Sequence, residues 1–232
     1  AGYVAYALDY YGDGKPLAWQ HRLIAASMNS LVFPLTTSLF MPQWVPKPVV
    51  NGFTDGAVAL FDRLMGSFAA REGSLSMPYA LSNVRVELAE WNPGVPISIW
   101  RSVGHSYTCF VIESFIDELA AAAGEDPAAF RRRYLKDSPR HLAVLDLVLE
   151  KSGWKDRPPP GRRRGVAVQA AFGSVVAQVA EVSVTADNAI RVHRVTCAVD
   201  CGTAINPDIV RQQMEGGILF GLSAALHGEI TL

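Results

Sequence analysis

The sequence has few cysteines and few charged residues. Three cysteines in 232 residues cannot form a disulfide framework, and their odd number leaves at least one thiol free. A reducing compartment or buried thiols fit this composition. Only 19% of the residues are charged while 50% are apolar, which is a low charge content for a free-standing soluble domain. We therefore expect part of the surface to be buried against a partner.

The sequence also lacks an excess of charge of either sign. Its 21 basic and 22 acidic residues leave a net charge of -1, so it has no long-range field to attract nucleic acid or an anionic bilayer. No apolar run approaches the roughly 18 residues of a membrane span, and the N-terminal stretch has no signal-peptide pattern. Because the chain starts without methionine and inside a strand-like pattern, we expect a processed chain or a fragment.

Apolar periodicity predicts strands and helices in both halves of the chain. Strands are expected over 3–10 and 17–26, which the turn Gly12-Asp13-Gly14 would join into a hairpin. Further strands are expected over 83–91, 165–172, 175–185 and 190–199, and Asp187-Asn188 would be the hairpin turn between the last two. Helices are expected over 57–70, 110–123 and 208–226, and after the N-cap and proline pairs Asp126-Pro127 and Ser138-Pro139.

The predicted fold class is α+β, with mixed sheets and flanking helices. Prolines interrupt residues 33–52, which predicts an extended or looping segment there. We divide the chain into a region of 1–155, with the first hairpin and a block of three helices, and a region of 166–232, with three strands and a glycine-rich helix. The proline-rich, basic residues 156–165 are predicted to be a linker between them.

The stretch CAVDCGTAINPDIVRQQMEGG, residues 197–217, places two cysteines beside acids and glycines. On a strand, Cys197 and Cys201 would lie about 13 Å apart, too far to share a metal or a disulfide unless the chain turns. No second Cys or His pair has zinc spacing, and the five histidines show no pairing with a thiol. Small buried thiols beside a glycine turn are therefore favoured over a metal site or a nucleophile.

The helix predicted after this stretch has a stripe of small residues. Gly217, Gly221 and Ala224 or Ala225 recur at helical spacing, so that another backbone or a flat ligand can approach closely. A helical glycine costs about 1 kcal/mol relative to alanine, which packing or a ligand must offset. A ligand and a tight helix-on-sheet crossing are about equally favoured. Gln213, one turn earlier, can both donate and accept hydrogen bonds, as a heterocycle needs.

A second candidate is the turn Arg101-Ser102-Val103-Gly104, which joins a strand-like run to a helix. Such a turn offers backbone N–H groups and a cation to an anionic or oxo ligand. By itself the motif is weak, since a surface arginine before a turn is common.

The two motifs together carry a family resemblance. RSVGHSYTCFVIESFIDELA, from Arg101, and AVDCGTAINPDIVRQQMEGGILFGLSAAL, from Ala198, resemble the molybdenum-binding large subunit of the xanthine dehydrogenase and aldehyde oxidase family. Within that family the chain is most similar to the isoquinoline 1-oxidoreductase type of beta subunit. The resemblance covers most of the chain. It departs from many relatives at Ser102, where they have glycine.

The resemblance implies a molybdopterin-binding domain and a set of partners. The complete protein would be a hydroxylase with a molybdopterin cytosine dinucleotide that contains molybdenum. Its substrate would be an aldehyde or N-heterocycle, its oxygen source water, and its electron acceptor the iron-sulfur clusters of a small subunit. The remaining segments of the large subunit would also be partners. We expect no nucleic-acid partner and no membrane span.

The resemblance also assigns roles to single residues. It places Arg101 beside the molybdenum, Ser102, Val103 and Gly104 in the loop around it, and Gln213 at the pterin. Asp200, Asn206 and Glu215 fall on positions with structural roles, at the turn and the helix start. The family's base glutamate lies in a glycine-rich Gly-x-Gly-Glu segment that this chain does not contain, so the resemblance assigns no catalytic residue here. We expect this chain alone to be inactive, and it could lack a bound cofactor.

Two other classes of function stay open. The chain could be a non-catalytic binding or assembly module on the same scaffold, or an unrelated enzyme with a reactive thiol at Cys201. The substrate is left open, as is the choice between bacterial periplasm and cytoplasm.

Overall fold

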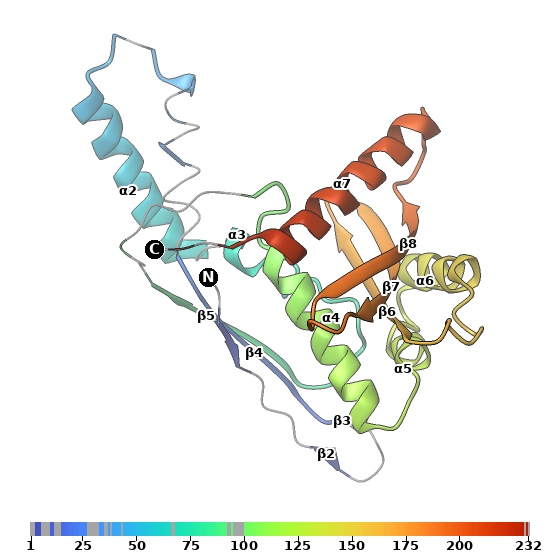
Figure 1. Ribbon diagram of the computed structural model, residues 1–232. Coiled ribbons are helices and arrows are strands. Elements are labelled where there is room, and N and C mark those ends of the chain that lie inside the picture. Colours follow the sequence, from blue (N-terminus) through green and yellow to red (C-terminus); the bar gives the residue numbers. More distant parts are fainter. Residues whose placement is uncertain are drawn as a thin grey trace. The chain divides into compact units, whose positions relative to one another are not determined.

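The protein folds into two compact units of mixed helices and strands. The computed structural model describes residues 3–5, 10–11, 15–26, 33–34, 37, 39–42, 44–65, 68–91, 94, 100–229 and 231 (Figure 1). One unit consists of Ala1–Met77 and Leu81–Gly124, and the other of Pro78–Ala80 and Glu125–Leu232. The fold class is α+β, as predicted. The predicted division at residues 156–165 stays a prediction.

The first unit contains a mixed three-stranded sheet. Its strands lie in the order β1 (Tyr3–Ala5), β4 (Trp19–Ala25) and β5 (Val84–Glu90). β1 pairs antiparallel with β4, as the predicted hairpin requires, and β4 pairs in parallel with β5. Two short strands, β2 (Tyr10–Tyr11) and β3 (Lys15–Pro16), extend the hairpin, while its predicted turn at Gly12-Asp13-Gly14 lies outside the described residues.

Helix α2 (Lys47–Met65) corrects the prediction of an extended segment over 33–52. The amide N–H groups of Val49 and Val50 donate to the carbonyl of Pro46, so the helix begins beside the prolines. Proline is compatible with a first helical turn, because its missing N–H has no helical acceptor there. The predicted helix 57–70 is the second half of α2 together with α3 (Phe68–Arg71). Several apolar side chains of α2 are more than half exposed: Val49, Phe53, Leu60 and Leu64.

Helix α4 (His105–Ala122) supplies the core of the first unit. Ile112, Ile116 and Leu119 are buried on it, and its Phe115 ring meets the ring of Trp19 edge to face, with centroids 5.3 Å apart. The helix ends where the pattern predicted, before Gly124 at φ +65°. It starts five residues earlier than predicted.

The second unit is built on an antiparallel sheet that helix α6 (Pro139–Ser152) covers on one face. The strands β6 (Arg162–Ala171), β7 (Ser174–Val184) and β8 (Ile190–Asp200) lie in this order. Buried apolar residues alternate along β6 and β7, which is the pattern of a sheet with one covered face. The core consists of Val144, Leu145, Val148 and Leu149 of α6 with Val166, Val168, Val175, Ala177, Val179 and Ala198 of the sheet.

The two predicted N-caps of the helical block behave differently. Asp126 caps α5 (Pro127–Tyr134) by accepting hydrogen bonds from the amides of Ala128 and Ala129, as predicted. Ser138 makes no such bond before α6 and instead donates to the carbonyl of Pro78 at 3.1 Å. Among the described residues, no helix is both long enough and apolar enough to span a membrane.

Strand β6 begins at Arg162, inside the predicted linker. The buried carboxylate of Glu181 accepts hydrogen bonds from Arg162 at 2.8 Å and from Arg164 at 2.9 Å. Arg162 and Arg164 are two residues apart and therefore share the covered face of the sheet. Their hydrogen bonds hold the pKa of Glu181 below its ordinary value of 4.5. The strand starts three residues earlier than the predicted range 165–172, because a run of three arginines hides the alternation of a strand.

Replacing Glu181 by glutamine should destabilise the fold at neutral pH and reduce its sensitivity to acid. Because the pKa of Glu181 is lowered in the folded state, its contribution is complete above pH 4.5 and is lost as pH falls toward the lower, folded value. Urea unfolding of Glu181→Gln and of the unchanged chain, at about pH 7 and about pH 4, measures both effects.

The matched control for this prediction is Glu150→Gln. The Glu150 side chain is 71% exposed and pairs with the adjacent Lys151, so the free energy of unfolding should change by no more than about 0.5 kcal/mol. Equal free energies of unfolding for the two glutamine variants at both pH values would contradict the role of Glu181.

Candidate functional site

The turn between β8 and helix α7 (Pro207–His227) is built by two polar side chains. The carboxylate of Asp200 accepts hydrogen bonds from Arg140 at 2.7 Å and from the amide of Gly202 at 2.9 Å. Chiefly through Arg140, these contacts lower the pKa of Asp200 to about 2. The side chain of Asn206 accepts hydrogen bonds from the amides of Asp208 and Ile209 and caps α7. Both residues hold the turn and the helix start, as predicted.

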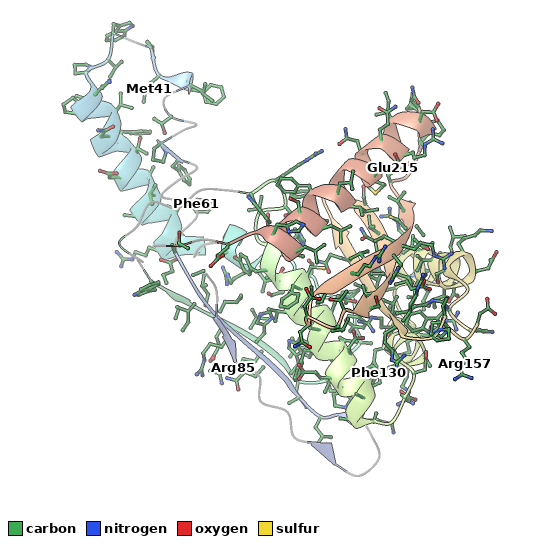
Figure 2. The ribbon with its side chains drawn as sticks, in the orientation of Figure 1. Met41, Phe61, Arg85, Phe130, Arg157 and Glu215 are labelled. Atoms are coloured by element: carbon green, nitrogen blue, oxygen red, sulfur yellow. The ribbon has the colours of Figure 1, made fainter. Side chains whose placement is uncertain are left out.

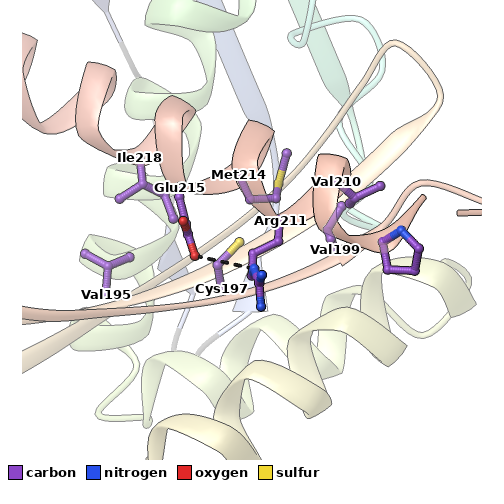
Figure 3. A pocket seen from close by; sticks show the side chains of 9 residues that line it. Val195, Cys197, Val199, Val210, Arg211, Met214, Glu215 and Ile218 are labelled. Carbon is purple, nitrogen blue, oxygen red and sulfur yellow. Dashed lines mark ion pairs between the residues drawn. The ribbon is translucent and has the colours of Figure 1, made fainter.

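Helix α7 lies beside β8 over an apolar hollow of about 410 Å³. Figure 3 shows that side chains of both elements face this hollow. Nε of Arg211 lies 4.0 Å from a carboxylate oxygen of Glu215, so Glu215 takes part in a local ion pair (Figure 3). Figure 2 labels Glu215 on α7. None of the described residues of α7 is buried. The residues that line the hollow are Val195, Cys197, Val199, Pro207, Val210, Arg211, Met214, Glu215 and Ile218.

The glycines of α7 do not make the tight helix-on-sheet crossing that was one of the two predicted explanations. A Cβ atom added at Gly216, Gly217 or Gly221 would meet no atom within 4 Å among the described residues. Met214 and Ile218 line the hollow beside β8 instead, and Gly217 lies about 60° around the helix from Met214 and about 100° from Ile218. Gln213, Gly217 and Gly221, at spacings of four residues, form a stripe on an exposed part of α7, here called the Gln213 stripe.

The thiols differ in exposure. Cys197 lines the hollow, and its half-burial raises its thiol pKa. Cys201 is exposed, so the prediction of a buried thiol is wrong for this residue, because β8 ends at Asp200 and Cys201 starts the turn. Within the described ranges, no group of three or more His, Cys, Asp or Glu side chains is placed to hold a metal ion.

The predicted residues Arg101 to Gly104 come together in one turn before α4, in the first unit. Val103 has φ +46°, a left-handed conformation that a β-branched residue rarely adopts and that costs about 1–3 kcal/mol. Its amide donates to the carbonyl of Trp100 at 3.0 Å. Arg101 is exposed, and Gly104 is buried under the helix start. A strained turn with an exposed cation is typical of a ligand-binding loop.

Hydroxyl groups hold this turn, a role that the sequence motif alone did not predict. The hydroxyl of Ser106 donates to the carbonyl of Val103 at 2.7 Å, and its oxygen lies 2.7 Å from the hydroxyl of Ser102. The Oγ1 of Thr108 lies 3.0 Å from the carbonyl oxygen of Gly104. The signal in the sequence was the spacing of Ser102 and Ser106, four residues apart at a helix start.

Two further contacts anchor the start of α4 to residues 70–72. Tyr107 donates its hydroxyl to the carbonyl of Ala70 at 2.6 Å, and burial raises the pKa of Tyr107 to about 12. Thr108 Oγ1 lies 2.7 Å from the carbonyl oxygen of Glu72. Burial lowers the pKa of His105, which follows the turn. The helix start is therefore fixed by buried hydroxyl groups.

The predicted cofactor-binding residues thus lie in two places. Arg101, Ser102, Val103 and Gly104 form the turn of the first unit, and Gln213 lies on the exposed stripe of α7 in the second unit.

Comparisons with known proteins point to one family. Residues 141–232 match the model of the molybdopterin cofactor-binding domain. The beta subunit of the isoquinoline 1-oxidoreductase of Brevundimonas diminuta is 39% identical over 152 residues, which are 64% of this chain and 20% of that protein. A subunit of the nicotinate dehydrogenase of Pseudomonas putida is 31% identical over 174 residues, which are 66% of this chain and 14% of that protein.

A solved structure is also similar. The aldehyde oxidoreductase of Desulfovibrio desulfuricans aligns with 78% of this chain and 19% of its own, at a TM-score of 0.36 and 16% sequence identity. The chain thus spans about a fifth or less of the length of these relatives. Residues 141–232 are thus similar to a molybdopterin cofactor-binding domain, and the chain is similar in sequence to the beta subunit of an isoquinoline 1-oxidoreductase, as the two sequence motifs predicted.

Proposed function

We propose that the chain contributes cofactor-binding surface to the large subunit of a molybdenum hydroxylase. The complete enzyme oxidises an aldehyde or N-heterocycle, takes oxygen from water and passes electrons to an iron-sulfur partner. The observation that carries the proposal is the match of residues 141–232 to a molybdopterin-binding domain, in which the Gln213 stripe is exposed. By itself the chain is inactive in this proposal.

The residues on the chain fit such a cofactor. A pterin needs partners that donate and accept hydrogen bonds, and the exposed amide of Gln213 does both. Gly217 and Gly221 add no side chain, and no described atom lies within 4 Å of where their Cβ atoms would be, so a flat ring can approach the helix. Arg101 supplies a cation from a strained turn. When bound, the cofactor supplies the metal centre for oxygen transfer and electron removal.

In the proposal each residue of the chain has a binding or positioning role. Gln213 would hold the pterin of a molybdopterin cytosine dinucleotide, and Arg101 would lie beside the molybdenum. Ser102, Val103 and Gly104 form the loop that sets the place of Arg101. The base that removes a proton from the attacking oxygen is not assigned to any residue of this chain.

The names of the two sequence relatives described above favour an N-heterocycle as substrate and a second subunit as partner, while the similar solved structure is named for an aldehyde. Isoquinoline and nicotinate are both N-heterocycles, and both relatives are named as subunits. The exposed apolar side chains of α2 and α7, with the low charge content, suit a chain that is covered by other segments of the large subunit.

The proposal is tested by metal analysis of the natural full-length protein, purified after growth with molybdate. About one molybdenum per large subunit is expected. Protein without molybdenum under these conditions would overturn the proposal and favour the alternative, a non-catalytic binding or assembly module on the same scaffold.

Replacing Gln213 by alanine in the full-length protein should lower its molybdenum and pterin content several-fold and leave its melting temperature within about 2 °C. The expected reason is that Gln213 is exposed on α7, so its loss removes a ligand contact and little packing. The matched control is Gln212→Ala, an exposed amide on the preceding residue of the helix. Equal cofactor content in both variants would remove Gln213 from the site.

Replacing Gly217 by alanine should have opposite effects on the chain and on the cofactor. Since the new Cβ meets no atom within 4 Å, the free energy of unfolding of the 232-residue chain should rise by about 0.5–1 kcal/mol. In the full-length protein, the same methyl group should lower cofactor content. Gly216→Ala is the control, because its Cβ is equally unhindered but lies off the stripe. Undiminished cofactor in Gly217→Ala would show that the stripe faces something else.

A further inference from the structure

We propose that Ser102 and Ser106 are positioning residues, which hold the cofactor-binding turn of Arg101 by keeping Val103 in its left-handed conformation. This inference rests on the proposed function. It gives Ser102 a role different from that of a cofactor ligand.

The hydroxyl hydrogens of the two serines have defined acceptors. A serine hydroxyl has one hydrogen, and that of Ser106 is donated to the carbonyl of Val103 at 2.7 Å. In the contact of 2.7 Å between Ser102 and Ser106, Ser102 must therefore be the donor. Its hydroxyl hydrogen points back to α4, so it is not available to an anionic ligand in this arrangement.

Val103 has a strained backbone conformation. At φ +46° a valine side chain is crowded against its own backbone, and the conformation persists only where neighbouring groups enforce it. The carbonyl of Val103 accepts hydrogen bonds from the hydroxyl of Ser106 at 2.7 Å and, more weakly, from the Ser106 amide at 3.3 Å. The amide of Val103 donates to the carbonyl of Trp100. The peptide groups on both sides of this strained residue are therefore fixed by hydrogen bonds.

The residues that follow Ser106 in α4 hold it in place. Tyr107 and Thr108, the next two residues of α4, bond to the carbonyls of Ala70 and Glu72. Thr108 is fully buried. Because these contacts fix the helix start, Ser106 is held in place, and its hydroxyl holds the carbonyl of Val103. The hydrogen bonds of the two serine hydroxyls thus stabilise at Val103 a backbone conformation that a glycine would adopt without them.

The test uses four variants of the full-length protein with its iron-sulfur partner: Ser106→Ala, Val103→Gly, the double variant of both, and Ser74→Ala. Ser74 is buried, and no described residue is a hydrogen-bond partner of its hydroxyl, so this variant is the control for removing a serine oxygen. The readouts are molybdenum content, the Mo(V) electron paramagnetic resonance spectrum, kcat and KM for an N-heterocycle, and hydrogen exchange of the Val103 amide.

In Ser106→Ala, we expect exchange of the Val103 amide to rise about tenfold, the Mo(V) spectrum to change, and kcat to fall about ten- to hundredfold with little change in KM. The double variant should recover most of this loss, since glycine at 103 adopts the same backbone conformation without enforcement. Ser74→Ala should match the unchanged protein.

Two results would overturn the inference while molybdenum is present: a Ser106→Ala variant with unchanged spectrum and kcat, or a double variant no better than Ser106→Ala. A protein without molybdenum would instead overturn the proposed function, so the two failures are distinguishable.

Discussion

The path of the chain from the sheet of the second unit into helix α7 depends on the carboxylate of Asp200. This side chain joins Arg140 of α6 to the amide of Gly202, and Arg140 also donates to the carbonyls of Asp200 and Gly173. Because no described residue of α7 is buried, packing contributes little to the direction of that helix. The direction of α7 is set by the turn, which Asp200 holds at one end and the Asn206 cap at the other. These two residues therefore determine where the Gln213 stripe lies.

Local signals made much of this fold predictable. Asp126-Pro127 and Asn206-Pro207 each place a capping side chain before a proline in the first turn, and both helices begin there. Gly124 has a positive φ angle where the end of a helix was predicted, and Asn188 has one where a hairpin turn was predicted. These signals are reliable because the physical cause lies within a few residues of its effect. The family resemblance rested on two such local motifs as well.

The features that the sequence did not reveal depend on contacts between distant residues. The strand start at Arg162 is stabilised by Glu181, which is 19 residues away, and the α4 start by carbonyls more than 30 residues away. The role of Ser106 was hidden for another reason. It depends on the backbone angle of Val103, and valine gives no sign in a sequence that it will adopt a conformation suited to glycine.

Glycines on an exposed helix need an explanation outside the helix. Gly217 and Gly221 each cost α7 about 1 kcal/mol relative to alanine, and no described atom is close enough to benefit from the missing side chains. Packing within the described residues therefore does not offset the cost. In the turn of Arg101, Val103 has a strained conformation that the hydroxyl groups of Ser102 and Ser106 stabilise. Both features destabilise the isolated chain, and both are understandable if the stripe and the turn are shaped for a cofactor that is bound only in the complete large subunit.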